Sequence, residues 1–270
     1  MSASPGSHAV PELAAAGALP LLLAAGLGCG LLNALASSGS ALTLPLLLLL
    51  GLDPATANAT NRLPVVVGAL SALVRFQRQG AVDWRLLARL APSSLGGTVL
   101  GAVAAQLLPA PDLRLAVTAA VLLALLVVLA GLNRLLAEPA ARPPRTDLVT
   151  QLAFFAIGCW LGFIVLDGAT YLLLGLVLLV RLPLLGANGL KAALIFLSSL
   201  VTLAIFADGG SVAWGAGSFL AIGSLAGGWL GASLAARPAA RLWTVRILLG
   251  VIVLEAAHLL SHYLPPPGPS

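Results

Sequence analysis

Two basic residues interrupt stretches that are otherwise almost wholly apolar. Arg62 and Lys191 each stand at the start of a long apolar segment. A charge within a membrane span usually faces the interior of the helix bundle and marks a transport pathway, and a pair of cations suits an anion. Thr60 and Asn61 directly precede Arg62 and offer a hydroxyl and an amide group to oxyanion oxygens. The alternative is that both cations extend from helix ends to lipid headgroups.

Two short apolar segments accompany these cations. Segments 40–51 and 169–180 hold 12 residues each, about 18 Å of helix against a hydrocarbon core of roughly 30 Å, so we expect half-helices. They follow the small and polar runs Ser38-Gly39-Ser40 and Asp167-Gly168-Ala169-Thr170. The amide N–H groups and the dipole at a helix N-terminus attract anions. Both breaks are therefore candidate anion sites, although Ser and Asp also serve as simple helix caps.

Other polar residues complete the candidate site. Asn33 lies in the first broken segment, and Asn188 is a weaker candidate. Asp167 would repel an anion unless it is paired or protonated, so it either carries a coupling proton or caps segment 169–180. The predicted substrate-binding residues are Asn33, Ser38, Gly39, Ser40, Thr60, Asn61, Arg62, Asp167, Gly168, Thr170 and Lys191.

The composition places these residues in a polytopic membrane protein. Apolar residues make up 60% of the 270 positions and charged residues 9%, which leaves too few polar side chains to cover a water-soluble domain. The chain also contains 29 Gly and 18 Pro. Helix breaks at membrane depth occur only where protein or a water-filled cavity surrounds them. We therefore expect an all-α fold with broken helices around an internal site.

Several other classes of function have little support in the sequence. The net charge of +5 is scattered and reports membrane orientation more readily than nucleic-acid binding. Cys29 and Cys159 are the only cysteines and cannot form a CxxC pair, so they are core fillers or, as the alternative, contacts to a sulfur-bearing substrate. The chain has no nucleotide-binding loop. We predict no cofactor, no metal and no removable signal peptide.

The second half of the chain repeats features of the first. A shift of 129 residues pairs Pro54 with Pro183 and Arg62 with Lys191, and a shift of 130 pairs Cys29 with Cys159. Collinear order favours a true repeat over chance similarity of apolar segments. We predict a first transmembrane repeat at 17–137, a polar linker rich in Pro and Arg at 138–147, a second repeat at 148–263, and a disordered tail at 264–270.

The loop charges predict that the two repeats are inverted. Arg75, Arg78, Arg85 and Arg89 surround one loop of the first half, whereas the equivalent loop at 208–210 has no basic residue. The bias reverses at the next loop, where the second half carries Arg237, Arg241 and Arg246. Basic residues favour the cytoplasmic side, so equivalent loops lie on opposite sides. We expect an inner-membrane location with both termini facing outward.

Three sequence motifs resemble the sulfite exporter TauE/SafE family of membrane permeases. They are Leu42-Thr43-Leu44-Pro45, Gly51-Leu52-Asp53-Pro54 and Ala57-Asn58-Ala59-Thr60-Asn61-Arg62, followed by the turn Gly80-Ala81-Val82-Asp83-Trp84 and its echo at 210–214. The resemblance implies a secondary transporter of small anions, typically sulfite, organosulfonates or related acids. Two departures are Ser38-Gly39-Ser40 and Leu166-Asp167-Gly168, where members often carry glycine-rich breaks.

The sequence therefore predicts transport of a small anion by alternating access, with no enzymatic activity. The partners expected are that anion, the lipid bilayer and a coupling proton or ion; the residues do not indicate an oligomeric state. The alternative is a membrane metal-binding protein or enzyme centred on Glu255, His258 and His262, which share one helical face. That group lacks further metal-ligating partners in the sequence.

Overall fold

The structure is a computed structural model of the whole chain. It describes residues 18–35, 39–107, 143–164 and 168–237, together with Leu242, Thr244, Arg246, Gly250 and Val253. Within these ranges the chain is helical and contains no strand, which confirms the predicted all-α class. The end of the predicted first repeat, half of the predicted linker, most of the second repeat beyond residue 237, and the predicted tail lie outside the described residues.

The described elements follow the same order in the two halves of the chain. The first half contains α2 (Ala18–Leu35), α3 (Ser40–Leu49), α4 (Pro54–Thr60), α5 (Arg62–Arg78) and α6 (Trp84–Leu107). The second half contains α8 (Leu148–Phe163), α9 (Gly168–Leu174), the π-helical turn η1 (Gly175–Leu179), α10 (Leu184–Asp208) and α11 (Trp214–Ala235). In each half a helix is followed by a short element, α3 or α9 with η1, at the positions predicted for half-helices.

The surface of this bundle is that of a membrane protein. Four of the described helices, α2, α6, α10 and α11, are long and apolar enough to cross a bilayer. Large apolar side chains such as Leu100, Leu152 and Ile222 are exposed on the outside, whereas Thr43, Asn61 and other polar side chains are buried. This is the reverse of the pattern in water-soluble proteins. Lipid tails solvate exposed apolar side chains, whereas polar side chains form hydrogen bonds with one another inside the protein.

Glycines bring helices of the two halves into backbone contact. On α6, a Cβ at Gly97 or Gly101 would overlap the carbonyl oxygens of Phe155 and Cys159 on α8. On α11, a Cβ at Gly227 would overlap the carbonyl oxygen of Leu27 on α2. Small residues permit such close approach of membrane helices. The first helix of each half is therefore packed against the last described helix of the other half.

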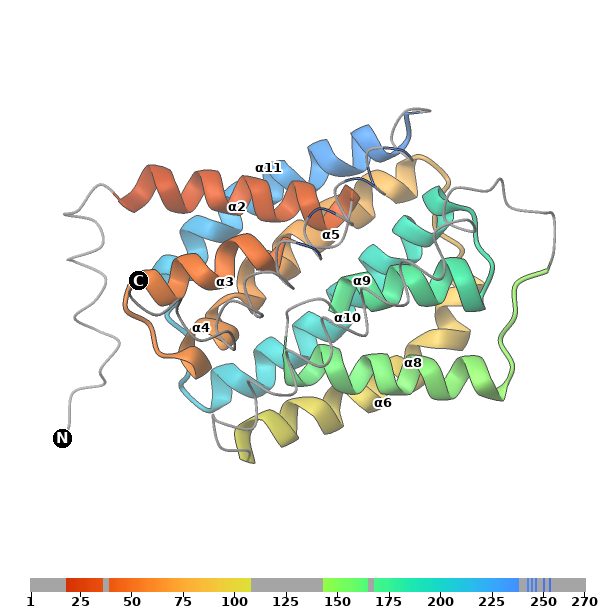
Figure 1. Cartoon of the computed structure of the whole chain (residues 1–270), viewed down its shortest axis with the longest axis horizontal. Coiled ribbons are helices and arrows are strands. Elements are labelled where there is room, and N and C mark those ends of the chain that lie inside the picture. Colours follow the sequence, from red (N-terminus) through yellow and green to blue (C-terminus); the bar gives the residue numbers. More distant parts are fainter. Residues whose placement is uncertain are drawn as a thin grey trace, which may run out of the picture.

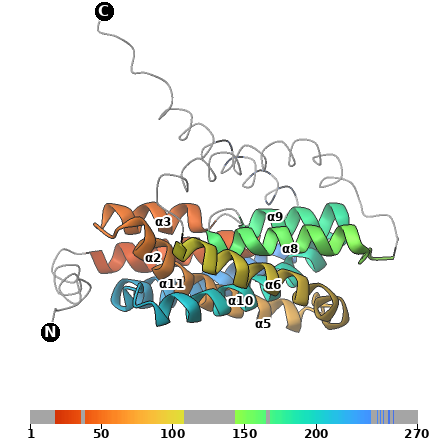
Figure 2. The same cartoon turned by 90° about the horizontal axis from the view of Figure 1, so that it is seen from below.

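Equivalent helices run in opposite directions along the long axis of the molecule. Figure 1 shows α2 and α5 running from left to right, and α8 and α10 from right to left. Seen from below, α3 and α9 lie along one side of the bundle and α5 and α10 along the other (Figure 2). The inverted relation of the halves to a membrane stays a prediction, and these directions support it.

Four arginines lie at one end of the bundle: Arg75 and Arg78 at the end of α5, and Arg85 and Arg89 near the start of α6. Arg75 on α5 donates a hydrogen bond from Nε to Ser233 Oγ on α11, and Gln79 donates to the carbonyl oxygen of Ala232. The ends of α5 and α11 therefore coincide. We call this the arginine end; the opposite end contains the start of α4 and the loop from α10 to α11.

Candidate functional site

Arg62 is buried at the junction of the two halves. It is the first residue of α5, its side chain is 0% exposed, and its Nη1 and Nη2 donate to the carbonyl oxygens of Leu161 and Gly162 at 2.5 and 3.2 Å. These carbonyls belong to the last turn of α8, where they have no partner within the helix and carry the negative end of its dipole. The Phe206 ring on α10 lies 5.6 Å from the guanidinium carbon.

Lys191 makes the reciprocal contact in the other half. Its side chain is also 0% exposed, and Nζ donates to Asn188 Oδ1 at 2.8 Å and to the carbonyl oxygen of Ala34 at 3.5 Å. Ala34 lies in the last turn of α2. Each cation therefore approaches the C-terminal end of the first helix of the opposite half. The alternative that Arg62 and Lys191 extend to headgroups is wrong, because both are wholly enclosed by protein.

The two cations differ in their position along a helix. Arg62 begins α5 after a break at Asn61, whereas Lys191 lies inside the continuous helix α10. Pro64 explains the break: it has no N–H to donate to the carbonyl of Thr60, and proline is tolerated only in the first turn of a helix. The equivalent residue in α10 is Ala193, which permits an uninterrupted helix. The expectation that Lys191 starts a helix is therefore wrong.

A polar cluster links the first break to this junction. The side chain of Asn33 accepts a hydrogen bond at 2.9 Å from the backbone N–H of Gly39, which precedes α3. Thr43 on α3 donates from Oγ1 to Asn61 Oδ1 at 2.6 Å. The Cys29 sulfur lies 3.6 Å from Asn33 Nδ2 and 3.7 Å from Thr43 Oγ1. Asn33 and Cys29 thus support the chain around the break.

Three buried polar atoms of the predicted site have no hydrogen-bond partner among the described residues. They are Asn61 Nδ2, Arg62 Nε and Thr170 Oγ1. Asn61 and Arg62 are adjacent, and Thr170 lies in the first turn of α9, whose Gly168 packs against Leu161. A buried donor without a partner costs about 1–3 kcal/mol, so such atoms are candidate contacts for a ligand. Two N–H donors, one of them cationic, suit an oxyanion.

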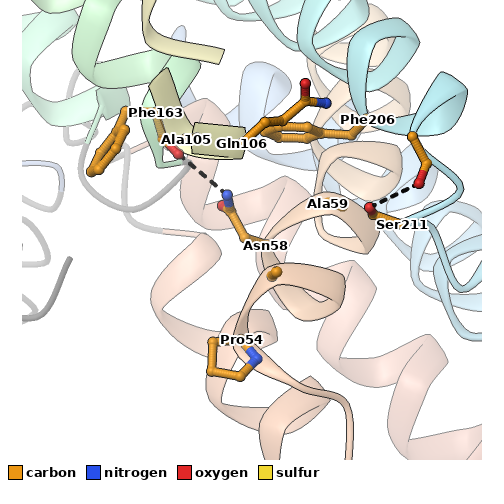
Figure 3. A pocket seen from close by; sticks show the side chains of 10 residues that line it. Pro54, Asn58, Ala59, Ala105, Gln106, Phe163, Phe206 and Ser211 are labelled. Carbon is orange, nitrogen blue, oxygen red and sulfur yellow. Dashed lines mark hydrogen bonds between the residues drawn. The ribbon is translucent and has the colours of Figure 1, made fainter. Parts of the chain in front are cut away.

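A pocket of about 530 Å³ is lined by residues at the start of α4 and at the loop from α10 to α11, the end opposite the arginine end. Asn58, which lines it, donates from Nδ2 to the carbonyl oxygen of Phe163 at 3.3 Å (Figure 3). Phe206 lines the same pocket and contacts the guanidinium of Arg62. The remaining lining residues carry no charge: Pro54, Ala55, Ala59, Ala105, Gln106, Gly209 and Ser211. Arg62 thus lies behind Phe206 in the pocket wall, and two carboxylates, Asp53 and Asp208, are chain neighbours of the lining residues Pro54 and Gly209.

The other predicted residues take varied places. Thr60 is buried and its Oγ1 accepts a hydrogen bond from the backbone N–H of Ala213 at 2.9 Å, so it ties α4 to the start of α11. Ser40 is buried in the first turn of α3, and Asn188 is a partner of Lys191. Cys159 on α8 is half-buried. The remaining positions, Ser38, Asp167, Glu255, His258 and His262, lie outside the described residues; the described part of the chain has no cluster of three metal-ligating side chains.

Sequence reasoning missed three residues that shape the site: Thr43, Asn58 and Phe206. Thr43 and Asn58 belong to polar positions of the motifs that suggested the family, so their setting among apolar residues was a signal. Phe206 had none, because an aromatic residue near the end of an apolar helix resembles ordinary core. Its role depends on the approach of α10 to α5.

Comparison with known proteins gives a consistent result over most of the chain. The model of the family described as Sulfite exporter TauE/SafE matches residues 22–259. A probable membrane transporter protein of Haemophilus influenzae is 30% identical over 80% of this chain and 84% of its own. The probable membrane transporter protein ORF9 of Sinorhizobium sp is 27% identical over 88% and 90%, and YfcA of Escherichia coli K12, named likewise, is 28% identical over 84% of each chain. No solved structure matches.

Proposed function

The chain belongs to the sulfite exporter TauE/SafE family of membrane transporters, and we propose that it carries a small sulfur-containing oxyanion, sulfite or an organosulfonate, past Arg62. One observation carries the proposal. Asn61 Nδ2 and Arg62 Nε are adjacent buried donors without a partner among the described residues. An oxyanion bound there would accept both hydrogen bonds and neutralise the buried guanidinium, which ends the cost of leaving them unpaired.

The surroundings of Arg62 favour a ligand that is bound and released. Two of its nitrogens are held by the last carbonyls of α8, so the cation is fixed in place and its Nε remains for the ligand. The side chains that line the adjacent pocket are neutral. Without a second full charge the anion is held by few strong contacts, as transport requires. A tetrahedral or pyramidal oxyanion presents several oxygens, enough to accept from both Asn61 Nδ2 and Arg62 Nε.

The position of the pocket supports an outward-open conformation. It lies at the end away from Arg75, Arg78, Arg85 and Arg89, and basic residues favour the cytoplasm. Close packing at the arginine end supports closure on that side: a Cβ at Gly189 would lie 2.5 Å from the carbonyl oxygen of Ala81. Alternating access would then open the Lys191 side and close the Arg62 side, in an inner-membrane protein with outward termini. A coupling proton or ion would complete the cycle.

Flux through the purified protein tests the proposal. The full chain is reconstituted in liposomes, and uptake of radiolabelled sulfite, methanesulfonate and acetate is measured for the wild type, Arg62→Ala and Asn61→Ala. Arg89→Ala is the matched control because Arg89 is exposed on α6, away from the pocket. We expect saturable uptake of sulfite or methanesulfonate that is lost in both site variants and kept in the control. Uptake unaffected by Arg62→Ala, in a variant that folds, would overturn the assignment.

Anion binding without flux provides a second readout. A ligand that binds the folded state raises thermal stability, so sulfite should raise the midpoint of unfolding of the wild type and of Arg89→Ala. It should not do so for Asn61→Ala, which removes the unpaired Nδ2 donor together with the acceptor of the Thr43 hydrogen bond. Equal stabilisation of all three proteins by sulfite would place the anion elsewhere.

A further inference from the structure

At the arginine end, two guanidinium groups lie against one tryptophan. Trp229 on α11 has the Cζ of Arg75 at 5.4 Å and the Cζ of Arg78 at 5.1 Å from its ring centroid. Arg75 is fixed further by its Nε hydrogen bond to Ser233 Oγ at 2.8 Å. Cation–π contact holds each guanidinium at the ring but leaves most of its N–H groups free. Two like charges are thereby concentrated on one small surface.

This surface, which we call the Trp229 site (Arg75, Arg78 and Trp229), lacks a compensating negative charge among the described residues. The ion pair found in the described part of the chain is between Arg145 and Asp147. Asp83, close in sequence, instead accepts hydrogen bonds from the backbone N–H groups of Arg85 and Leu86. Two cations brought together without a carboxylate favour a bound anion, and guanidinium groups match the geometry of phosphate.

Apolar residues lead from the bilayer to this site on both helices. On α5, Leu70 and Val74 are exposed and lie two turns and one turn before Arg78. On α11, Ile222 and Leu225 are exposed and lie on the same helical face as Trp229. The helices are tied there by Ser71 Oγ, which donates to the carbonyl oxygen of Leu225 at 2.7 Å. The result is an apolar stripe that ends at two cations and an indole ring.

We propose that the Trp229 site binds the phosphate of an anionic phospholipid, with its acyl chains along the exposed stripe of α5 and α11. Basic sites between transmembrane helices bind acidic headgroups, and tryptophan prefers the membrane interface. The lipid would hold α5, which carries Arg62, against α11. A free phosphate ion shares the headgroup chemistry but cannot use the apolar stripe.

Lipid binding to the full chain tests this site. The purified protein in a neutral detergent is titrated with phosphatidylglycerol, phosphatidylcholine or inorganic phosphate, and bound lipid is counted by native mass spectrometry. The variant Arg75→Gln/Arg78→Gln is compared with Arg85→Gln/Arg89→Gln, which removes the same charge from exposed positions at the same end. We expect the wild type to prefer phosphatidylglycerol and the first variant to bind it about 25-fold more weakly, with little change in the second.

Three results would overturn the proposal. Equal affinity of the wild type for phosphatidylcholine would show that headgroup charge is not recognised, and this comparison needs no variant to fold. Equal loss in both double variants would assign binding to the general charge of this end. Displacement of phosphatidylglycerol by inorganic phosphate at equal concentration would show that the apolar stripe contributes nothing.

Discussion

Arg62 and Lys191 occupy equivalent positions in the two halves but stand in different surroundings. Arg62 follows a helix break, keeps Nε without a described partner and lies beside a pocket. Lys191 lies within a continuous helix and has Asn188 one turn away as a hydrogen-bond partner. Two residues before it, the backbone of Gly189 lies so close to the carbonyl oxygen of Ala81 that a Cβ would not fit without a shift. Both cations are buried, but the Arg62 side chain keeps a nitrogen without a described partner, and its neighbour Phe206 lines a pocket.

Under the proposed function, the difference explains why only one of two similarly ordered halves would provide a ligand site. Both cations contact the C-terminal end of a helix in the opposite half, so both stabilise the interface of the halves. The Pro64 break adds to this, at Arg62, the end of helix α4 at Thr60 and a single turn residue, Asn61, between α4 and α5. Where Ala193 replaces proline, the same positions are helical and their backbone is paired. We therefore expect Arg62 to act on the anion and Lys191 mainly to hold the closed side.

Removing each charge should separate these roles most strongly. In Arg62→Met the anion loses its charged donor, and two α8 carbonyls lose their partner, so we expect flux to fall at least about 100-fold, equivalent to roughly 3 kcal/mol. In Lys191→Met we expect about a tenfold fall, since Ala34 and Asn188 lose one donor. Liposome uptake of sulfite measures both. Equal losses would mean that the two cations bind the anion in turn.

Joining α4 to α5, or interrupting α10, should have the next largest effect on sulfite flux and on stability. Pro64→Ala restores the N–H that joins α4 to α5, so we expect about a tenfold loss of sulfite flux with unchanged or slightly higher thermal stability. The reciprocal Ala193→Pro removes an interior hydrogen bond of α10 and should lower stability by about 3 kcal/mol. Uptake and thermal unfolding of both variants test this. Full activity of Pro64→Ala would show that the break is dispensable.

The sequence predicted the scaffold better than the contacts within it. Apolar segment lengths identified α3 and α9 as short elements, because helix length is set by local sequence against a fixed membrane thickness. The partners of Arg62 could not be predicted, since the Leu161 and Gly162 carbonyls come from another half and carry no side-chain signal. The importance of Pro64 was missed for a related reason. A proline near the start of an apolar segment is common, and only the structure shows that its missing N–H interrupts the helix next to Asn61.

Access from solution should distinguish the two ends. With Cys29 and Cys159 replaced by alanine, a cysteine at Ser211 in the pocket should react with a charged maleimide about tenfold faster than one at Val82. Val82 is buried near Gly189 at the closed side. Added sulfite should slow the reaction at position 211 by occupying the pocket. Similar rates at both positions, in detergent where both ends are reachable, would contradict a structure open on one side only.

The smallest expected difference concerns how the equivalent helices α4 and α10 begin. Asp53 caps α4 by accepting hydrogen bonds from the N–H groups of Ala55 and Thr56, both at 3.1 Å, whereas Pro183 gives α10 no side-chain cap. A hydrogen bond from the Thr56 side chain, and after it these backbone bonds, lower the pKa of Asp53 below its ordinary value of 3.8. The contribution of the Asp53 carboxylate to the free energy of unfolding is therefore complete above that value and is lost as pH falls through the lowered pKa.

Because Asp53 is exposed, we expect Asp53→Asn to cost under about 1 kcal/mol near neutral pH. Thermal unfolding should show the two proteins converging in acid, and a constant difference down to the lowest pH would show that the carboxylate charge plays no part. Pro183→Asp, at the N-cap position of α10, asks whether α10 gains from the cap that it lacks.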